Sequence, residues 1–166
     1  MGNFLRSAAK YIVIFSLISG CSTLSVDGPT TVFGGYQFKL DEQPTLIGAS
    51  ASDSLVLTFE DGAKLVFVFN HYKDFALNNL PLDGFIDVVY GESATSNMQL
   101  KLIKDEISKQ RISSYQSIKD GFTVHVIKFV DKDKLILLSK DRTDTWVEID
   151  VVQMDSDKLL DAMKAM

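Results

Sequence analysis

The chain has 166 residues, a formal net charge of −5 and a single cysteine. This length suffices for one hydrophobic core without disulfide bonds or a structural metal. The acidic balance argues against a nucleic acid partner, which requires clustered lysine and arginine, and one cysteine excludes an internal disulfide.

The N-terminal segment has the organisation of a signal peptide. Arg6 and Lys10 form a basic region, residues 11–18 are almost entirely apolar, and the small residues Ser19 and Gly20 follow. The apolar stretch is less than half of the roughly 20 residues that a membrane-spanning helix needs. We therefore expect a cleaved leader over residues 1–20.

The residues Ile18, Ser19, Gly20 and Cys21 resemble the lipobox of bacterial lipoproteins, in which small residues precede a cysteine. The resemblance implies cleavage between Gly20 and Cys21 and covalent lipid on the Cys21 thiol, often with acylation of the new amino group. Two or three acyl chains would hold the protein on a membrane, because one myristoyl chain binds with only about 10⁴ M⁻¹. The alternative is that residues 11–19 form a buried element and Cys21 is an ordinary core thiol.

The residues after the cysteine suggest an address and a tether. Ser22, in place of Asp, resembles lipoproteins that are forwarded to the outer membrane, so we expect an outer-membrane protein that faces the periplasm. Residues 21–31 are mostly small and polar and include Gly28-Pro29, which favours a lipidated tether. A single folded domain is expected over residues 32–166.

A β-hairpin is expected in the first half of this domain. The β-rich runs 55–59 and 64–69 are joined by a segment that contains Asp61-Gly62, a strong hairpin signal. An earlier strand is expected near residues 36–40, after a turn at Gly34-Gly35.

The middle of the chain is ambiguous. Residues 85–90 fit either a strand or a helix. Residues 98–109 favour a helix, because Leu100, Ile103 and Ile107 then share one side, although the first positions also alternate as in a strand.

The C-terminal half predicts a three-stranded meander over residues 122–130, 134–140 and 145–152. Two tight connections would pair residue 131 with 134 and residue 141 with 144, which fixes the register. In that register the core face carries six apolar side chains, namely Ile127, Phe129, Ile136, Leu138, Val147 and Ile149. A final helix is expected from about residue 157 to 166, with Asp155 or Ser156 as its N-cap.

These elements predict an α+β domain. Its antiparallel sheet would combine the N-terminal hairpin and the C-terminal meander, with one or two packed helices that include the C-terminal one. The order of hairpin, helix, meander and helix resembles that of Mog1/PsbP-like α+β domains, and this likeness of architecture implies no activity.

A candidate protein-binding patch follows from the predicted register. Trp146 would lie with Val126, Leu135 and Leu137 on the second face of the meander, and aromatic anchors of this kind are typical of binding surfaces. The simpler alternative is that a helix covers this face.

The candidates for catalysis are few. The sequence contains two histidines, and no nucleophile elbow, zinc-binding helix or phosphate-binding loop. His125 is expected near Lys140 and Thr145 at the open end of the core face, as an ordinary rim histidine. We therefore expect no enzyme, no metal and no cofactor besides the lipid on Cys21.

The sequence thus favours a membrane-anchored accessory protein that binds another envelope protein. Two alternatives stay open. One is a lipid-tethered inhibitor or immunity protein, and the other is a small ligand-binding module or hydrolase that uses His125 with a nearby carboxylate.

Overall fold

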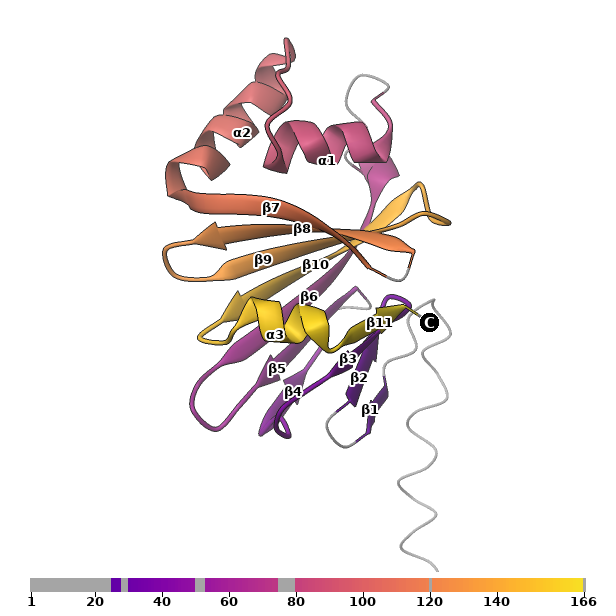
Figure 1. The fold of residues 1–166 in the computed structure, drawn as a ribbon, viewed down its shortest axis with the longest axis vertical. Coiled ribbons are helices and arrows are strands. Elements are labelled where there is room, and N and C mark those ends of the chain that lie inside the picture. Colours follow the sequence, from indigo (N-terminus) through magenta and orange to yellow (C-terminus); the bar gives the residue numbers. More distant parts are fainter. Residues whose placement is uncertain (1–24, 28–29, 50–52, 75–79, 120, 166) are drawn as a thin grey trace, which may run out of the picture.

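Antiparallel strands dominate the computed structural model, which describes residues 25–27, 30–49, 53–74, 80–119 and 121–165. Within these ranges seven strands form the larger sheet, in the spatial order β4 (Leu46–Gly48), β5 (Ser54–Thr58), β6 (Lys64–His71), β10 (Thr145–Val152), β9 (Asp133–Ser139), β8 (Phe122–Phe129) and β7 (Arg111–Lys119). The smaller, four-stranded sheet of the same ranges has the order β1 (Ser25–Asp27), β2 (Thr30–Phe33), β3 (Tyr36–Lys39) and β11 (Met163–Ala165) (Figure 1).

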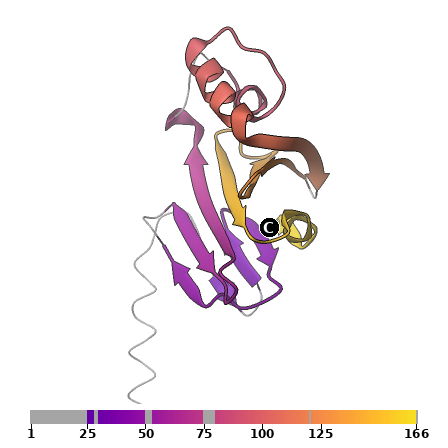
Figure 2. The same cartoon turned by 90° about the vertical axis from the view of Figure 1, so that its left-hand side faces the viewer.

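Short helices complete the described structure. They are the 3₁₀ turn η2 (Tyr72–Asp74) and the α-helices α1 (Leu82–Tyr90), α2 (Met98–Gln110) and α3 (Ser156–Asp161). Figures 1 and 2 place α1 and α2 together at the end of the molecule farthest from β1 and β2. In the part of the chain that the structure describes, no helix is long and apolar enough to cross a membrane.

Two hairpins form where glycines permit tight turns. Gly34 and Gly35 both have positive φ and form the predicted turn before β3, which they join to β2, a strand that the sequence did not predict. A side chain at Gly34 would clash, because a Cβ there would overlap with Cγ2 of Val147. The predicted hairpin of β5 and β6 is also confirmed, with Gly62 at φ 88° in its connection.

The seven-stranded sheet has two differently covered faces. Its inner face packs against the four-stranded sheet and α3 in one large core, which includes Phe67, Leu135, Leu137 and Ile149. Its outer face packs under α1 and α2 in a smaller core, which includes Ile127, Ile136, Leu138 and Trp146. Both cores depend on the alternation of side chains along the strands.

The predicted fold class is wrong, because the described structure is predominantly β and has two sheets where an α+β domain with one sheet was expected. The unexpected strands lack a clear apolar alternation. β1, β4 and β11 have three residues each, and β7 is mostly exposed on both sides. β1 and the start of β2 lie in the range expected for the tether.

The meander of β8, β9 and β10 is confirmed, but its predicted register is wrong. β8 and β9 pair Lys128 with Asp133, a shift that keeps the predicted faces together. β9 and β10 pair Leu137 with Val147, whereas the predicted register pairs Leu138 with Val147. This shift by one residue exchanges the two faces of β10 relative to β9. Val147 therefore lies in the inner core, whereas Leu138 lies on the outer face.

The helices differ from expectation mainly at their ends. α2 confirms the helix expected over 98–109, and α1 resolves the ambiguous segment as a helix. α3 begins after its N-cap Asp155, as predicted, but it ends at Asp161. The residues that follow enter β11 and pair with β3.

Candidate functional site

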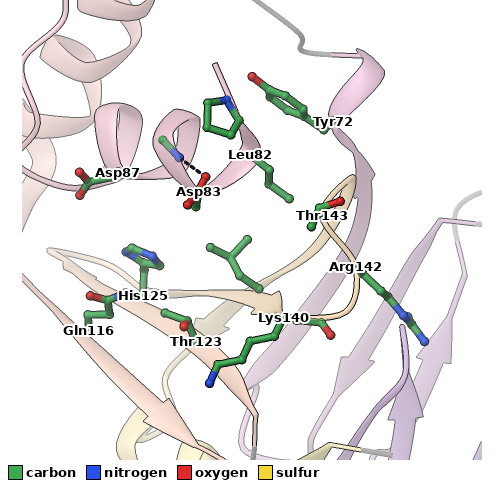
Figure 3. A pocket seen from close by; sticks show the side chains of 14 residues that line it. Tyr72, Leu82, Asp83, Asp87, Gln116, Thr123, His125, Lys140, Arg142 and Thr143 are labelled. Atoms are coloured by element: carbon green, nitrogen blue, oxygen red, sulfur yellow. Dashed lines mark hydrogen bonds between the residues drawn. The ribbon is translucent and has the colours of Figure 1, made fainter. Parts of the chain in front are cut away.

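An open pocket of about 950 Å³ lies between α1 and the outer face of the seven-stranded sheet (Figure 3). The helix side contributes Pro81, Leu82, Asp83, Gly84 and Asp87. The sheet side contributes residues of β7, β8, β9 and the loop after β9, namely Gln116, Thr123, His125, Leu138, Ser139, Lys140, Arg142 and Thr143, and Tyr72 adds an aromatic wall.

His125 is the titratable side chain that β8 presents to this pocket. Alternation along β8 buries Val124 and Val126 in the inner core and turns His125 toward α1 (Figure 3). Burial lowers the pKa of His125, and the negative charge of Asp87 partly opposes this effect. The imidazole is therefore held neutral at pH 7, with one nitrogen able to donate and the other able to accept a hydrogen bond.

Two carboxylates line the helix side of the pocket. Asp83 and Asp87 are four residues apart, so they lie on the same side of α1. Asp83 accepts a hydrogen bond from the Gly84 amide at 2.9 Å, and Asp87 accepts one from the Ser93 hydroxyl. Each carboxylate keeps acceptor capacity beyond the bond named, because a carboxylate has about four lone-pair sites.

Two cations lie at the opposite rim. Lys140 is exposed at the end of β9. Arg142 is held by the four-stranded sheet, because its Nη1 donates to the Gly34 carbonyl at 2.9 Å. The pocket therefore has carboxylates on α1 and the Lys140 ammonium at the opposite rim, whereas the Arg142 guanidinium points toward the β2–β3 turn (Figure 3).

Hydroxyl side chains also line the pocket, and they include Thr123, Ser139 and Thr143. Ser139 is a pocket hydroxyl, but its oxygen accepts a hydrogen bond from the Asp141 amide at 3.2 Å within the loop. Among the described residues, no three His, Cys, Asp or Glu side chains gather as a metal site would require. His71 lies at the end of β6 with its ring against Phe69, and it does not line this pocket.

The residues of the predicted patch are not brought onto one surface. Trp146 is 3% exposed and faces α1, where its ring lies 6.0 Å from that of Phe85. Its indole Nε1 donates to Glu148 Oε1 at 3.0 Å, and the Tyr90 hydroxyl donates to the same atom at 3.1 Å. The other three residues are buried in the inner core, on the opposite face: Val126, Leu135 and Leu137.

The remaining expectations divide into two groups. Gly20 and Cys21 lie outside the described residues. His125 is confirmed on the same strand as predicted, but it pairs with Ile136 and not with the rim residues expected. Sequence patterns did not reveal Asp83 and Asp87, although their four-residue spacing would have placed them together had the segment been assigned to a helix.

Comparison with known proteins gives no family for this chain. No protein family model matches it, and no curated protein sequence is significantly similar to it.

Proposed function

We propose that the protein is a lipid-anchored protein of the bacterial envelope that binds a polar ligand in the pocket beside His125. The observation that carries the binding role is the opposition of Asp83 and Asp87 on α1 to the neutral His125 on β8. Carboxylates beside an uncharged imidazole favour a ligand group that is cationic and donates hydrogen bonds, such as a primary amine.

The lipobox supports the lipid anchor, and its position close to β1 supports an orientation of the domain relative to the membrane. Cys21 precedes Ser25, the first residue of β1, by four residues, and such a segment spans at most about 14 Å. A lipid on Cys21 would therefore keep β1 near the membrane. Since α1 lies at the other end of the molecule (Figure 1), the pocket that α1 lines would lie far from the lipid surface.

The anchor is tested by metabolic labelling with palmitate. Wild-type protein is expected to carry the label and to sediment with membranes, and Cys21→Ser to carry none, because the acceptor thiol is absent. Equal labelling of both proteins, or an intact mass that still includes the first 20 residues, would contradict the anchor.

The pocket is tested with a matched pair of sugars, glucosamine and N-acetylglucosamine, which differ in the charge of one nitrogen. Titration of the detergent-solubilised protein at pH 7 is expected to move the NMR signals of the His125 ring with glucosamine only. Asp83→Asn combined with Asp87→Asn should abolish the shift.

The control for that titration is Asp105→Asn, which removes an exposed carboxylate from α2 and should bind glucosamine as wild type does. Shifts of equal size with both sugars would show that the carboxylates do not select an amine. Absence of any saturable shift would contradict the assignment of the pocket as an amine site.

A further inference from the structure

The strand β7 is an unpaired edge of unusual length. In the described part of the chain it is the last strand of the seven-stranded sheet, and it runs for nine residues. β4, at the other edge, has only three residues. Proteins usually protect long edges with charges, prolines or short strands, because free N–H and C=O groups there recruit another strand.

β7 has a β-bulge between Arg111 and Ser113, but its regular part from Ser113 onward lacks charges and prolines before Lys119. Residues 112–118 have the sequence Ile-Ser-Ser-Tyr-Gln-Ser-Ile, with no charge and no proline. The flanking charges are engaged within the chain. Arg111 donates to the Tyr90 carbonyl at 3.0 Å and pairs with Glu92, and Lys119 donates to the Leu160 carbonyl at 2.7 Å. Because partners within the chain hold both charged groups, neither group is free to repel an approaching strand.

Most of the large apolar side chains that are exposed in the described ranges belong to two consecutive elements, α2 and β7. Of the nine large hydrophobic residues exposed in the described ranges, six belong to α2 and β7, namely Met98, Leu102, Ile103, Ile112, Tyr115 and Ile118. Ile112 and Ile118 are 67% and 72% exposed. Ile112 and Ile118 therefore leave apolar surface exposed at both ends of the uncharged run of β7.

The edge is self-complementary in sequence. An antiparallel pairing about Tyr115 would place Ser113 opposite Ser117 and Ser114 opposite Gln116, and would bring Ile112 close to Ile118. Every polar residue then meets a polar residue and the two isoleucines meet, which is the condition for a two-fold symmetric interface. An unrelated peptide would not require this near-palindrome.

We propose that two copies of this protein pair through β7, in antiparallel register about Tyr115 or an adjacent residue, so that their sheets become continuous. The proposal does not depend on the lipid anchor or on the ligand. It has one consequence for the pocket, because Gln116 lies both on β7 and in the pocket lining. The partner strand would extend the floor of each pocket.

A cysteine scan tests the pairing in intact cells that carry the full chain. Single cysteines replace each residue from 112 to 118, cells are oxidised, and disulfide dimers are separated without reduction. A residue on the two-fold axis lies beside its own copy, within the 4.4–6.8 Å Cα separation that a disulfide needs. A residue three positions away lies about 20 Å from its copy.

We expect dimers at one position among 114, 115 and 116, and none at Ile112 or Ile118. Leu46→Cys, which is 64% exposed on the opposite edge strand, is the matched control and should give none. No dimer at any position, or equal dimer at all of them, would overturn the proposal. A dimer of the wild-type chain would come from Cys21 and would contradict the lipid anchor alone, and the scan would then use Cys21→Ser.

A second arm introduces charge without disturbing the core. Ile112→Lys combined with Ile118→Lys is expected to abolish the disulfide at the axis position, because a pair of ammonium groups would then face each other at each end of the interface. Leu46→Lys should leave it intact. Retention of the dimer in the double variant would also overturn the pairing.

Discussion

The orientation and the pKa of His125 are both set by the residues around it. Its neighbours Val124 and Val126 are fully buried, and this alternation places the imidazole against α1. Burial then lowers the pKa of His125, while the Asp87 carboxylate limits that decrease. The sequence analysis expected an ordinary rim histidine near Lys140, whereas in the structure burial is the main cause of the pKa shift.

The lowered pKa of His125 predicts a pH dependence of stability. In the unfolded chain a histidine takes up its proton near pH 6.5, and in the folded protein His125 does so at lower pH. The unfolded state therefore binds more protons in that interval, and the free energy of unfolding falls as the pH drops through 6.5. His125→Gln removes this contribution.

Urea unfolding at pH 7 and pH 5 measures the effect. Wild-type protein is expected to lose more stability between the two pH values than His125→Gln does, because all other titrating groups are shared. A loss in the variant that equals or exceeds the wild-type loss would show that His125 is not held neutral by folding.

At the level of elements, strong local patterns were predictive and weak ones were not. The β5–β6 hairpin and the three strands of the meander were identified from alternation and from Asp61-Gly62. β7 was not predicted as a strand, because most of its residues are exposed and its sequence shows no alternation of apolar and polar residues. The C-terminal helix was predicted too long, because Met163 continues the apolar spacing although it belongs to β11.

The register error that moved Trp146 arose at the connection between β9 and β10. Two-residue turns were assumed on both sides of β9, and the connection to β10 is longer, over residues 140–144. Arg142 in this loop donates to Gly34 of the four-stranded sheet, a contact that no local pattern encodes. One residue of difference moved Trp146 to the face opposite Val126, and so the predicted patch does not exist as one surface.

The N-cap of α2 gives a prediction at this scale. The Asn97 side chain accepts hydrogen bonds from the amides of Gln99 and Leu100 at 2.9 and 3.3 Å. Asn97→Ala leaves these donors without that partner and is expected to cost about 1 kcal/mol of stability. Asn97→Asp keeps the acceptor and should be close to wild type. Urea unfolding compares the three proteins, and equal losses in both variants would contradict the capping role.

At the scale of the whole molecule, the candidate site exists only because distant segments meet. α1 lies some forty residues before β8 in the chain, and the β9–β10 loop follows later still. Sequence patterns located His125 on its strand, but they could not show that Asp83 and Asp87 face it. Covering the outer face with α1 both hides Trp146 and builds the pocket next to it.

The two sheets are expected to unfold together because one core joins them. Phe67 of β6 is fully buried, and its ring lies 5.5 Å from Phe33 and 5.1 Å from Phe38, both in the four-stranded sheet. Phe67→Ala should therefore cost about 3–5 kcal/mol. Val130→Ala, at a site that is 83% exposed, should change stability by less than about 0.5 kcal/mol.

Guanidinium unfolding followed by Trp146 fluorescence and by far-ultraviolet circular dichroism measures both variants. Trp146 reports on the outer core, whereas circular dichroism reports on all strands, so coincident curves mean that the sheets unfold as one unit. In Phe67→Ala both curves should move to lower denaturant by the same amount. If the circular dichroism curve moved and the Trp146 curve did not, the four-stranded sheet would be a separate unit and the shared core would not couple it to the pocket.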